Sequence, residues 1–219
     1  MSPTHIGLLS IVLLFLIAML EVGIIESAYQ KLGMSNRAVT LLLLLSIFGS
    51  YINIPVATIS AISPPPAIHH HHHIYNLSYI AAVLHNADDT IIAVNLGGAV
   101  IPVLLSAYLL MRVGGVAPAF IATVVVALLV HHFSRIVPGA GIAVPTFIPG
   151  FAAAILAILL TRERRPVVAY VAGTIGCLVG ADVLNLALVA RLNTPIASIG
   201  GAGTFDGVFV SGVIAVLLA

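Results

Sequence analysis

Long apolar segments follow one another along almost the entire chain and restrict it to one environment. Hydrophobic residues make up 61% of the 219 residues and charged residues 7%, and the mean hydropathy is +1.20. A soluble domain of this length cannot bury so much apolar surface. A helix needs ~20 apolar residues to cross a bilayer, and most segments reach that length. There are about seven: residues 6–28, 38–59, 91–111, 117–133, 136–160, 166–190 and 196–219.

This pattern predicts an all-α, polytopic integral membrane protein with one transmembrane domain over residues 1–219. We expect the first segment to remain as a membrane span, because no small-residue cleavage site follows it. The lipid bilayer is therefore an expected partner, and a homo-oligomer is left open. The net charge of +1 argues against nucleic acid. The single cysteine, Cys177, excludes an intrachain disulfide.

Basic residues divide unequally between the two sides of the predicted membrane. The loops after the first, third and fifth segments hold six of them, and the opposite side holds two. The positive-inside rule places the N-terminus outside and the C-terminus in the cytoplasm, with residues 60–90 forming a long extracytoplasmic loop. The six are Lys31, Arg37, Arg112, Arg162, Arg164 and Arg165, and the two are Arg135 and Arg191.

Prolines and glycines interrupt several segments beside polar residues. Asn53 precedes Pro55 in the second segment, Asn95 precedes two glycines and Pro102 in the third, and residues 145–150 contain two prolines in the fifth. Proline frees a carbonyl one turn earlier, which can coordinate a cation or a water. We expect broken or re-entrant helices like those that form transporter sites, with Asn53 and Asn95 among the ion ligands.

Each of the last two segments carries an aspartate. Asp182 and Asp206 lie ~12 Å and ~15 Å from the boundary that the two segments share, by the helical rise per residue. A carboxylate inside a membrane is costly unless it is neutralised, paired or hydrated, so it indicates a functional site. We expect the two side chains to face each other and to titrate as a coupled pair, with Asn185 and Thr204 completing an ion site.

Two further features are candidate sites. Glu21 lies deep in the first segment, where an acid can belong either to an ion pathway or to the membrane interface. A run of five histidines stands in the long loop; neutral imidazoles bind transition metals, but consecutive spacing does not build a specific site. We expect weak metal binding there and no other cofactor. The run comprises His69, His70, His71, His72 and His73.

Five strings resemble an archaeal and bacterial family of multipass membrane proteins, a domain of unknown function. This resemblance covers nearly the whole chain except the histidine loop, and it implies a prokaryotic cell membrane without an established activity. The strings are residues 49–55 (GSYINIP), 93–99 (AVNLGGA), 141–149 (GIAVPTFIP), 180–186 (GADVLNL) and 198–207 (SIGGAGTFDG).

A second resemblance covers only the last two segments. Residues 203–211 are similar to the Gly-x-Gly-Asp motif of intramembrane aspartyl proteases, the presenilin and prepilin-peptidase type. The resemblance implies that Asp182 and Asp206 are a catalytic pair, in which two carboxylates share one proton and activate a water.

The sequence therefore leaves three functions open. The first is a cation- or proton-coupled carrier or channel, in which the aspartates bind the ion. The second is a protease that cleaves a membrane-spanning peptide, and the third is a non-catalytic membrane scaffold. A carrier needs an enclosed pocket lined by oxygen atoms, whereas a protease needs an open, hydrated groove beside Asp206.

Overall fold

The computed structural model describes residues 21–60, 89–137, 141–145, 147–191, 196–201 and 207–219, and most of them are helical. The expected histidine loop lies outside these residues. The first described helix is Glu21–Lys31. It is followed by α2 (Asn36–Gly49), a π-helical turn η1 (Leu96–Val100) that continues into α4 (Ile101–Val113), α5 (Val116–Phe133), α6 (Ile148–Leu160), α7 (Arg165–Ala181), a 3₁₀ segment η2 (Val183–Arg191) and α8 (Gly207–Leu218).

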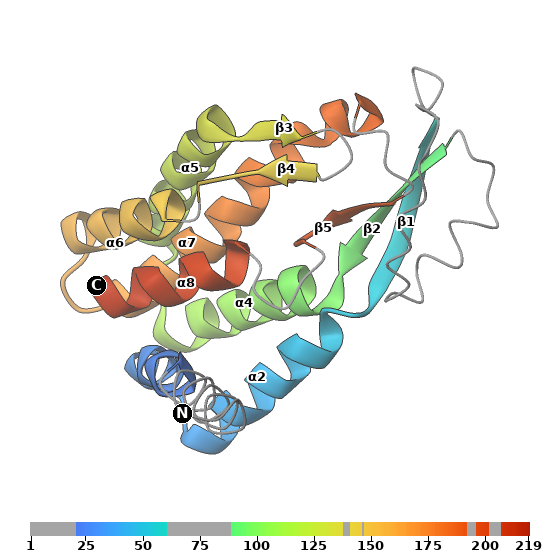
Figure 1. The fold of residues 1–219 in the computed structure, drawn as a ribbon. Helices are drawn as coiled ribbons and strands as arrows, with labels where there is room; N and C mark the ends of the chain where they lie inside the picture. The colour runs from blue at the N-terminus through green and yellow to red at the C-terminus, as the bar shows by residue number, and fades with distance from the viewer. Residues whose placement is uncertain (1–20, 61–88, 138–140, 146, 192–195, 202–206) are drawn as a thin grey trace, which may run out of the picture.

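Helix α7 is the centre of the bundle, with α4, α5, α6 and α8 packed around it (Figure 1). The candidate span that contains it, Arg165–Ala187, is 72% buried, against 28% for α5. Glycines allow this close packing: Gly173 faces α8, and a Cβ on Gly176 or Gly180 would overlap Val126 or Ala127 of α5. Helix α7 is therefore central, and it packs against its neighbours through small residues.

A three-stranded sheet lies at one end of the bundle (Figure 1). Its order is β1 (Asn53–Ser60), β2 (Asp89–Asn95), β5 (Ile196–Ile199), with β1 and β2 antiparallel and β2 and β5 parallel. The short strands β3 (Arg135–Val137) and β4 (Gly141–Ala143) form a separate pair. The all-α expectation is therefore wrong in this part. The runs are rich in β-branched residues, which favour strands, and hydropathy alone does not distinguish a buried strand from a helix.

The described residues contain three helices long and apolar enough to cross a membrane: Leu96–Val113, Val116–Phe133 and Arg165–Ala187. A fourth is counted if Glu21–Lys31 and α2, which meet at 118°, form one broken span. Helices α6 and α8 are apolar but shorter. Seven crossings are thus not confirmed, because the second segment leaves the helix after Gly49 and the third begins as strand β2.

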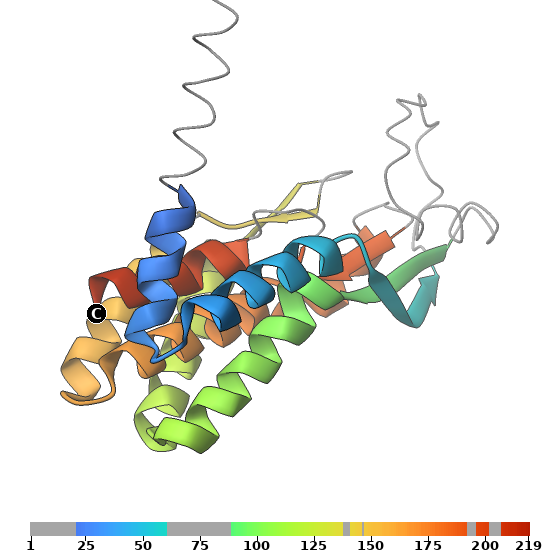
Figure 2. The same ribbon diagram turned by 90° about the horizontal axis from the view of Figure 1, so that it is seen from below.

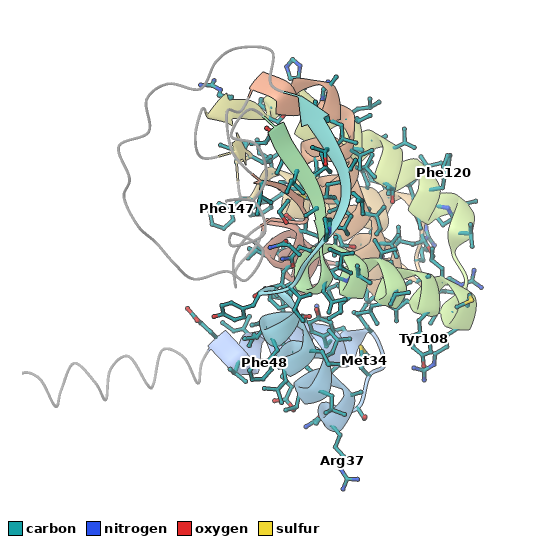
Figure 3. The ribbon with its side chains drawn as sticks, turned by 90° about the vertical axis from the view of Figure 1, so that its right-hand side faces the viewer. Met34, Arg37, Phe48, Tyr108, Phe120 and Phe147 are labelled. Atoms are coloured by element: carbon teal, nitrogen blue, oxygen red, sulfur yellow. The ribbon has the colours of Figure 1, made fainter. Side chains whose placement is uncertain are left out.

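The outer face of the bundle is strongly apolar. Four aromatic side chains project outward (Figure 3): Phe48 from α2, Tyr108 from α4, Phe120 from α5 and Phe147 from the turn directly before α6. Phe48 and Phe120 are 67% and 69% exposed. Aromatic and aliphatic side chains at this exposure cost free energy in water and none in lipid, which agrees with a membrane environment for these helices.

The helix turns lie at the opposite end of the bundle from the sheet, as two perpendicular views show (Figures 1 and 2). Here Lys31 donates hydrogen bonds from Nζ to the carbonyl oxygens of Val216 (3.2 Å) and Leu217 (2.8 Å). A cation at the C-terminal end of α8 stabilises the helix dipole and the last carbonyl groups. The first helix is thereby attached to the last.

Candidate functional site

Asp182 lies at the sheet end of α7, directly after its last helical residue. Its Oδ2 accepts a hydrogen bond of 2.7 Å from the backbone N–H of Gly200, just after β5. Gly200 has φ +86°, and a Cβ there would come within 2.7 Å of Ala99 in η1. Only glycine combines this conformation with so close an approach. The carboxylate therefore fixes the β5 end against η1.

The C-terminal end of α7, which is the negative end of the helix dipole, lies directly beside the Asp182 carboxylate. A negative charge at a helix C-terminus is unfavourable, so this position favours a bound proton or cation. In the part of the chain that the structure describes, the Asp182 carboxylate has no further hydrogen bond and no ion pair. The side chain is only partly buried, and it retains acceptor capacity for a proton or a cation.

The Asn185 side chain has a structural role and makes no hydrogen bond with the Asp182 carboxylate. Its Nδ2 donates to the carbonyl oxygens of Gly180 (3.0 Å) and Ala181 (2.9 Å) and to Ser134 Oγ (3.0 Å). The sequence analysis predicted Asn185 as an ion ligand beside Asp182. The α-helix ends at Ala181 and the following 3₁₀ segment directs the Asn185 amide nitrogen back onto the helix end, so a role of Asn185 as an ion ligand stays a prediction.

A second polar cluster connects β1, β2, β5 and the end of α2. Asn95 Nδ2 donates to the Ser50 carbonyl oxygen (2.8 Å) and to Asn53 Oδ1 (3.1 Å), while its Oδ1 caps η1 by accepting the N–H of Gly98 (2.8 Å). Asn53 and Asn95 are paired residues in the β1–β2 register. The strand pairing therefore brings together two of the asparagines predicted as ligands.

Ser198 extends this cluster to β5. Its Oγ lies 2.6 Å from Asn53 Oδ1 and 3.0 Å from the Gly201 carbonyl oxygen, and both are acceptors. A hydroxyl has one proton, so it satisfies one of these oxygens at a time. Ser198 and Gly201 flank the segment whose Gly200 binds Asp182. The carboxylate and the asparagine cluster thus meet on the same short stretch, residues 198–201.

The remaining predicted residues divide into two groups. Glu21 is exposed and makes no hydrogen bond or ion pair with the site among the described residues. Thr204, Asp206 and the run His69, His70, His71, His72 and His73 lie outside the described residues, so the aspartate pair and the metal prediction remain predictions.

The groups of the site that could bind an ion are carboxylate, amide, hydroxyl and backbone groups. Within the described ranges, no three His, Cys, Asp or Glu side chains gather as metal ligands. One carboxylate with amide, hydroxyl and backbone oxygens suits hard cations and not transition metals. The sequence reasoning missed Ser50, Ser198 and Gly200. Only Gly200 had a signal, the Gly200-Gly201 pair after an apolar run, which indicates a sharp turn.

The comparisons with known proteins concern the same region. Residues 47–218 match the family model described as "Protein of unknown function (DUF1614)". The chain belongs to this family. The match includes the asparagine cluster, Asp182 and Gly200, and it confirms the expected membership of an uncharacterised family. It begins after Lys31, so the contact between the first helix and α8 lies partly outside it. No curated protein and no solved structure matches the chain.

Proposed function

We propose that this member of the DUF1614 family is a membrane carrier or channel that moves a proton or a small cation, with Asp182 as the ion-binding carboxylate. The observation that carries the proposal is the position of Asp182. It stands at the negative end of the most buried helix, with one oxygen held by Gly200 and acceptor capacity left over. A bound cation or proton removes the electrostatic cost of that arrangement.

The surrounding cluster is better suited to binding an ion than to binding a large substrate. Asn53 and Gly201 supply an amide and a backbone oxygen, each within hydrogen-bonding distance of the Ser198 hydroxyl oxygen. Such oxygens replace the hydration shell of a cation when irregular backbone lines a transporter site. Asp206 is the second carboxylate of the proposed site, as expected from its depth, and Thr204 is a further ligand.

The proposal includes a membrane arrangement. The turn end, with six basic residues, faces the cytoplasm of a prokaryotic cell, and the sheet end with Asp182 faces outward. Helices α6 and α8, of 13 and 12 residues, span only about 20 Å of a core that is about 30 Å thick. Extended or re-entrant chain beside them would complete seven crossings, with the N-terminus outside.

Substitution of Asp182 by asparagine tests the ion-binding role. Asparagine keeps an oxygen that can accept the Gly200 N–H, so the fold is retained while the negative charge is lost. We expect Asp182→Asn in liposomes to lower proton or sodium flux at least tenfold, about 1.4 kcal/mol in barrier terms. Proton flux would be followed with a pH-sensitive dye inside the vesicles under an imposed H⁺ gradient. Sodium flux would be followed with a sodium-sensitive dye under an imposed Na⁺ gradient.

Glu163→Gln is the matched control, because it removes an exposed carboxylate at the turn end. It should leave flux unchanged. Equal flux in Asp182→Asn and the unaltered chain would refute the proposal. So would cleavage of a membrane-spanning peptide without ion flux, lost in both Asp182→Asn and Asp206→Asn, because that result identifies a protease. Absence of both activities in the unaltered chain would favour the scaffold.

A further inference from the structure

A strongly basic surface lies at the end of the bundle opposite the sheet, and the proposed function does not use it. Three turns form it: the turn before α2, the α4–α5 turn and the α6–α7 turn, which lie at the same end in two views (Figures 1 and 2). The only acid in residues 29–37, 112–116 and 161–165 is Glu163. The basic residues are Lys31, Arg37, Arg112, Arg162, Arg164 and Arg165.

Contacts between arginines and neighbouring turns make this surface continuous. Arg112 Nη1 donates to the Gly33 carbonyl oxygen (3.3 Å), which joins the end of α4 to the turn before α2. Arg164 lies over Gly114 and Gly115, and a Cβ on Gly114 would be 3.3 Å from its Nη1. The α6–α7 turn is therefore in contact with the α4–α5 turn, and the three turns that carry the six cations are contiguous.

Several of these cations have no protein partner. Arg37, Arg162 and Arg164 are exposed, and in the described part of the chain their guanidinium groups form no hydrogen bond or ion pair. Arg37 projects outward from α2 (Figure 3). Arg165 is different, because its Nε donates to the Thr161 carbonyl oxygen (3.2 Å). Unpaired guanidinium groups on one face are ready to bind phosphate by paired N–H donors.

Large apolar side chains stand beside the same cations. Met111 precedes Arg112 and is 81% exposed, and Leu159 lies three residues before Arg162 and is 74% exposed. Leu41 is 60% exposed and lies one helical turn from Arg37 on the same face of α2. Exposed apolar side chains therefore lie close in the sequence to three of the six cations, Arg37, Arg112 and Arg162. A soluble phosphate matches only the charge, whereas a lipid matches both.

We propose that this basic end binds anionic phospholipids, with Arg37, Arg162 and Arg164 on the headgroup phosphates and the adjacent apolar side chains on the acyl chains. Anionic lipids attract basic groups near the membrane surface, and clusters between helices select their headgroups. A lipid that bridges two turns also holds the helices of those turns together.

Native mass spectrometry of the full chain in detergent tests this inference. We expect phosphatidylglycerol to bind at least tenfold more tightly than phosphatidylcholine. The triple variant Arg37→Gln, Arg162→Gln, Arg164→Gln should lose at least tenfold of its affinity for phosphatidylglycerol. Replacement of the same three residues by lysine should give an affinity between those of the glutamine variant and the unaltered chain, because the charge remains but the paired N–H donors are lost.

Arg135→Gln is the control, because Arg135 is an exposed arginine in β3, away from the basic end. It should bind phosphatidylglycerol like the unaltered chain. The inference is overturned if the triple glutamine variant binds as tightly as the unaltered chain, or if Arg135→Gln weakens binding equally. Displacement of the lipid by excess inorganic phosphate also overturns it, since that result identifies a site for free anions. Protection of the buried Cys177 from a maleimide confirms that each variant is folded.

Discussion

Gly97→Ala is expected to destabilise the fold by about 3 kcal/mol, the upper range for overpacking a rigid site. A Cβ on Gly97 would overlap the Ser46 carbonyl oxygen and the Ser50 backbone nitrogen, and Gly49 faces it across the contact. These are backbone atoms at the end of α2, so no change of rotamer relieves the overlap. Helix α2 and η1 would have to separate, and the hydrogen bond from Asn95 to the Ser50 carbonyl would lengthen.

Cys177 provides the measurement. It is the only cysteine and it is buried in α7, so a thiol-reactive fluorophore labels it when the bundle unfolds. For a chain of this size, a loss of about 1 kcal/mol in the free energy of unfolding lowers the unfolding temperature by about 2–4 °C. Labelling of Gly97→Ala should therefore begin at a temperature about 6–12 °C lower than labelling of the unaltered chain.

Gly23→Ala is the control for the loss of a glycine. Gly23 lies in the first described helix, and nothing stands within 4 Å of an added Cβ. Alanine there should leave the unfolding temperature unchanged or raise it, because alanine favours helix. Equal unfolding temperatures for Gly97→Ala and the unaltered chain would show that α2 and η1 do not cross closely.

The sequence predicted the long helices well, because a membrane-spanning helix requires a continuous apolar segment and hydropathy measures that property directly. Residues 117–133 match α5 almost to the residue, and the segment from 166 contains α7. The sheet was not predictable in the same way. Strand β2 pairs with β5 about a hundred residues later, from Ile91 with Ile196 to Val94 with Ile199. A parallel pair needs a long crossover, and no local pattern reveals its partner.

The site was predicted in its residues and not in its geometry. Asp182, Asn53 and Asn95 stood out because polar side chains in apolar segments need partners. Their actual partners are a backbone N–H and residues brought in by strand register, which hydropathy does not encode. The surroundings of Asn185 were not predicted for a related reason. Its placement assumed that the helix continued past Ala181, whereas the α-helix ends there and the Asn185 amide turns back onto the helix end.

Asn95→Asp should also destabilise the chain strongly, by about 3–5 kcal/mol. Asp is as good an N-cap as Asn, so the acceptor for the Gly98 N–H is kept. The substitution removes the Nδ2 donor and sets an oxygen against the Ser50 carbonyl and Asn53 Oδ1, which lie 2.8 and 3.1 Å from the present nitrogen. Asn95 is only 1% exposed, so water cannot screen the new charge.

Two further variants separate capping from the strand contacts. Asn95→Leu loses both functions and should unfold, by Cys177 labelling, at a temperature similar to that of Asn95→Asp. Asn36→Leu is the control: the Asn36 side chain is exposed and accepts one hydrogen bond, from Gln30, so its loss should cost less than about 1 kcal/mol. If Asn95→Asp unfolded at the same temperature as the unaltered chain, the helix cap alone would account for the contribution of Asn95 to stability. The amide bridge between β1, β2 and α2 would then contribute nothing to holding the sheet against the bundle.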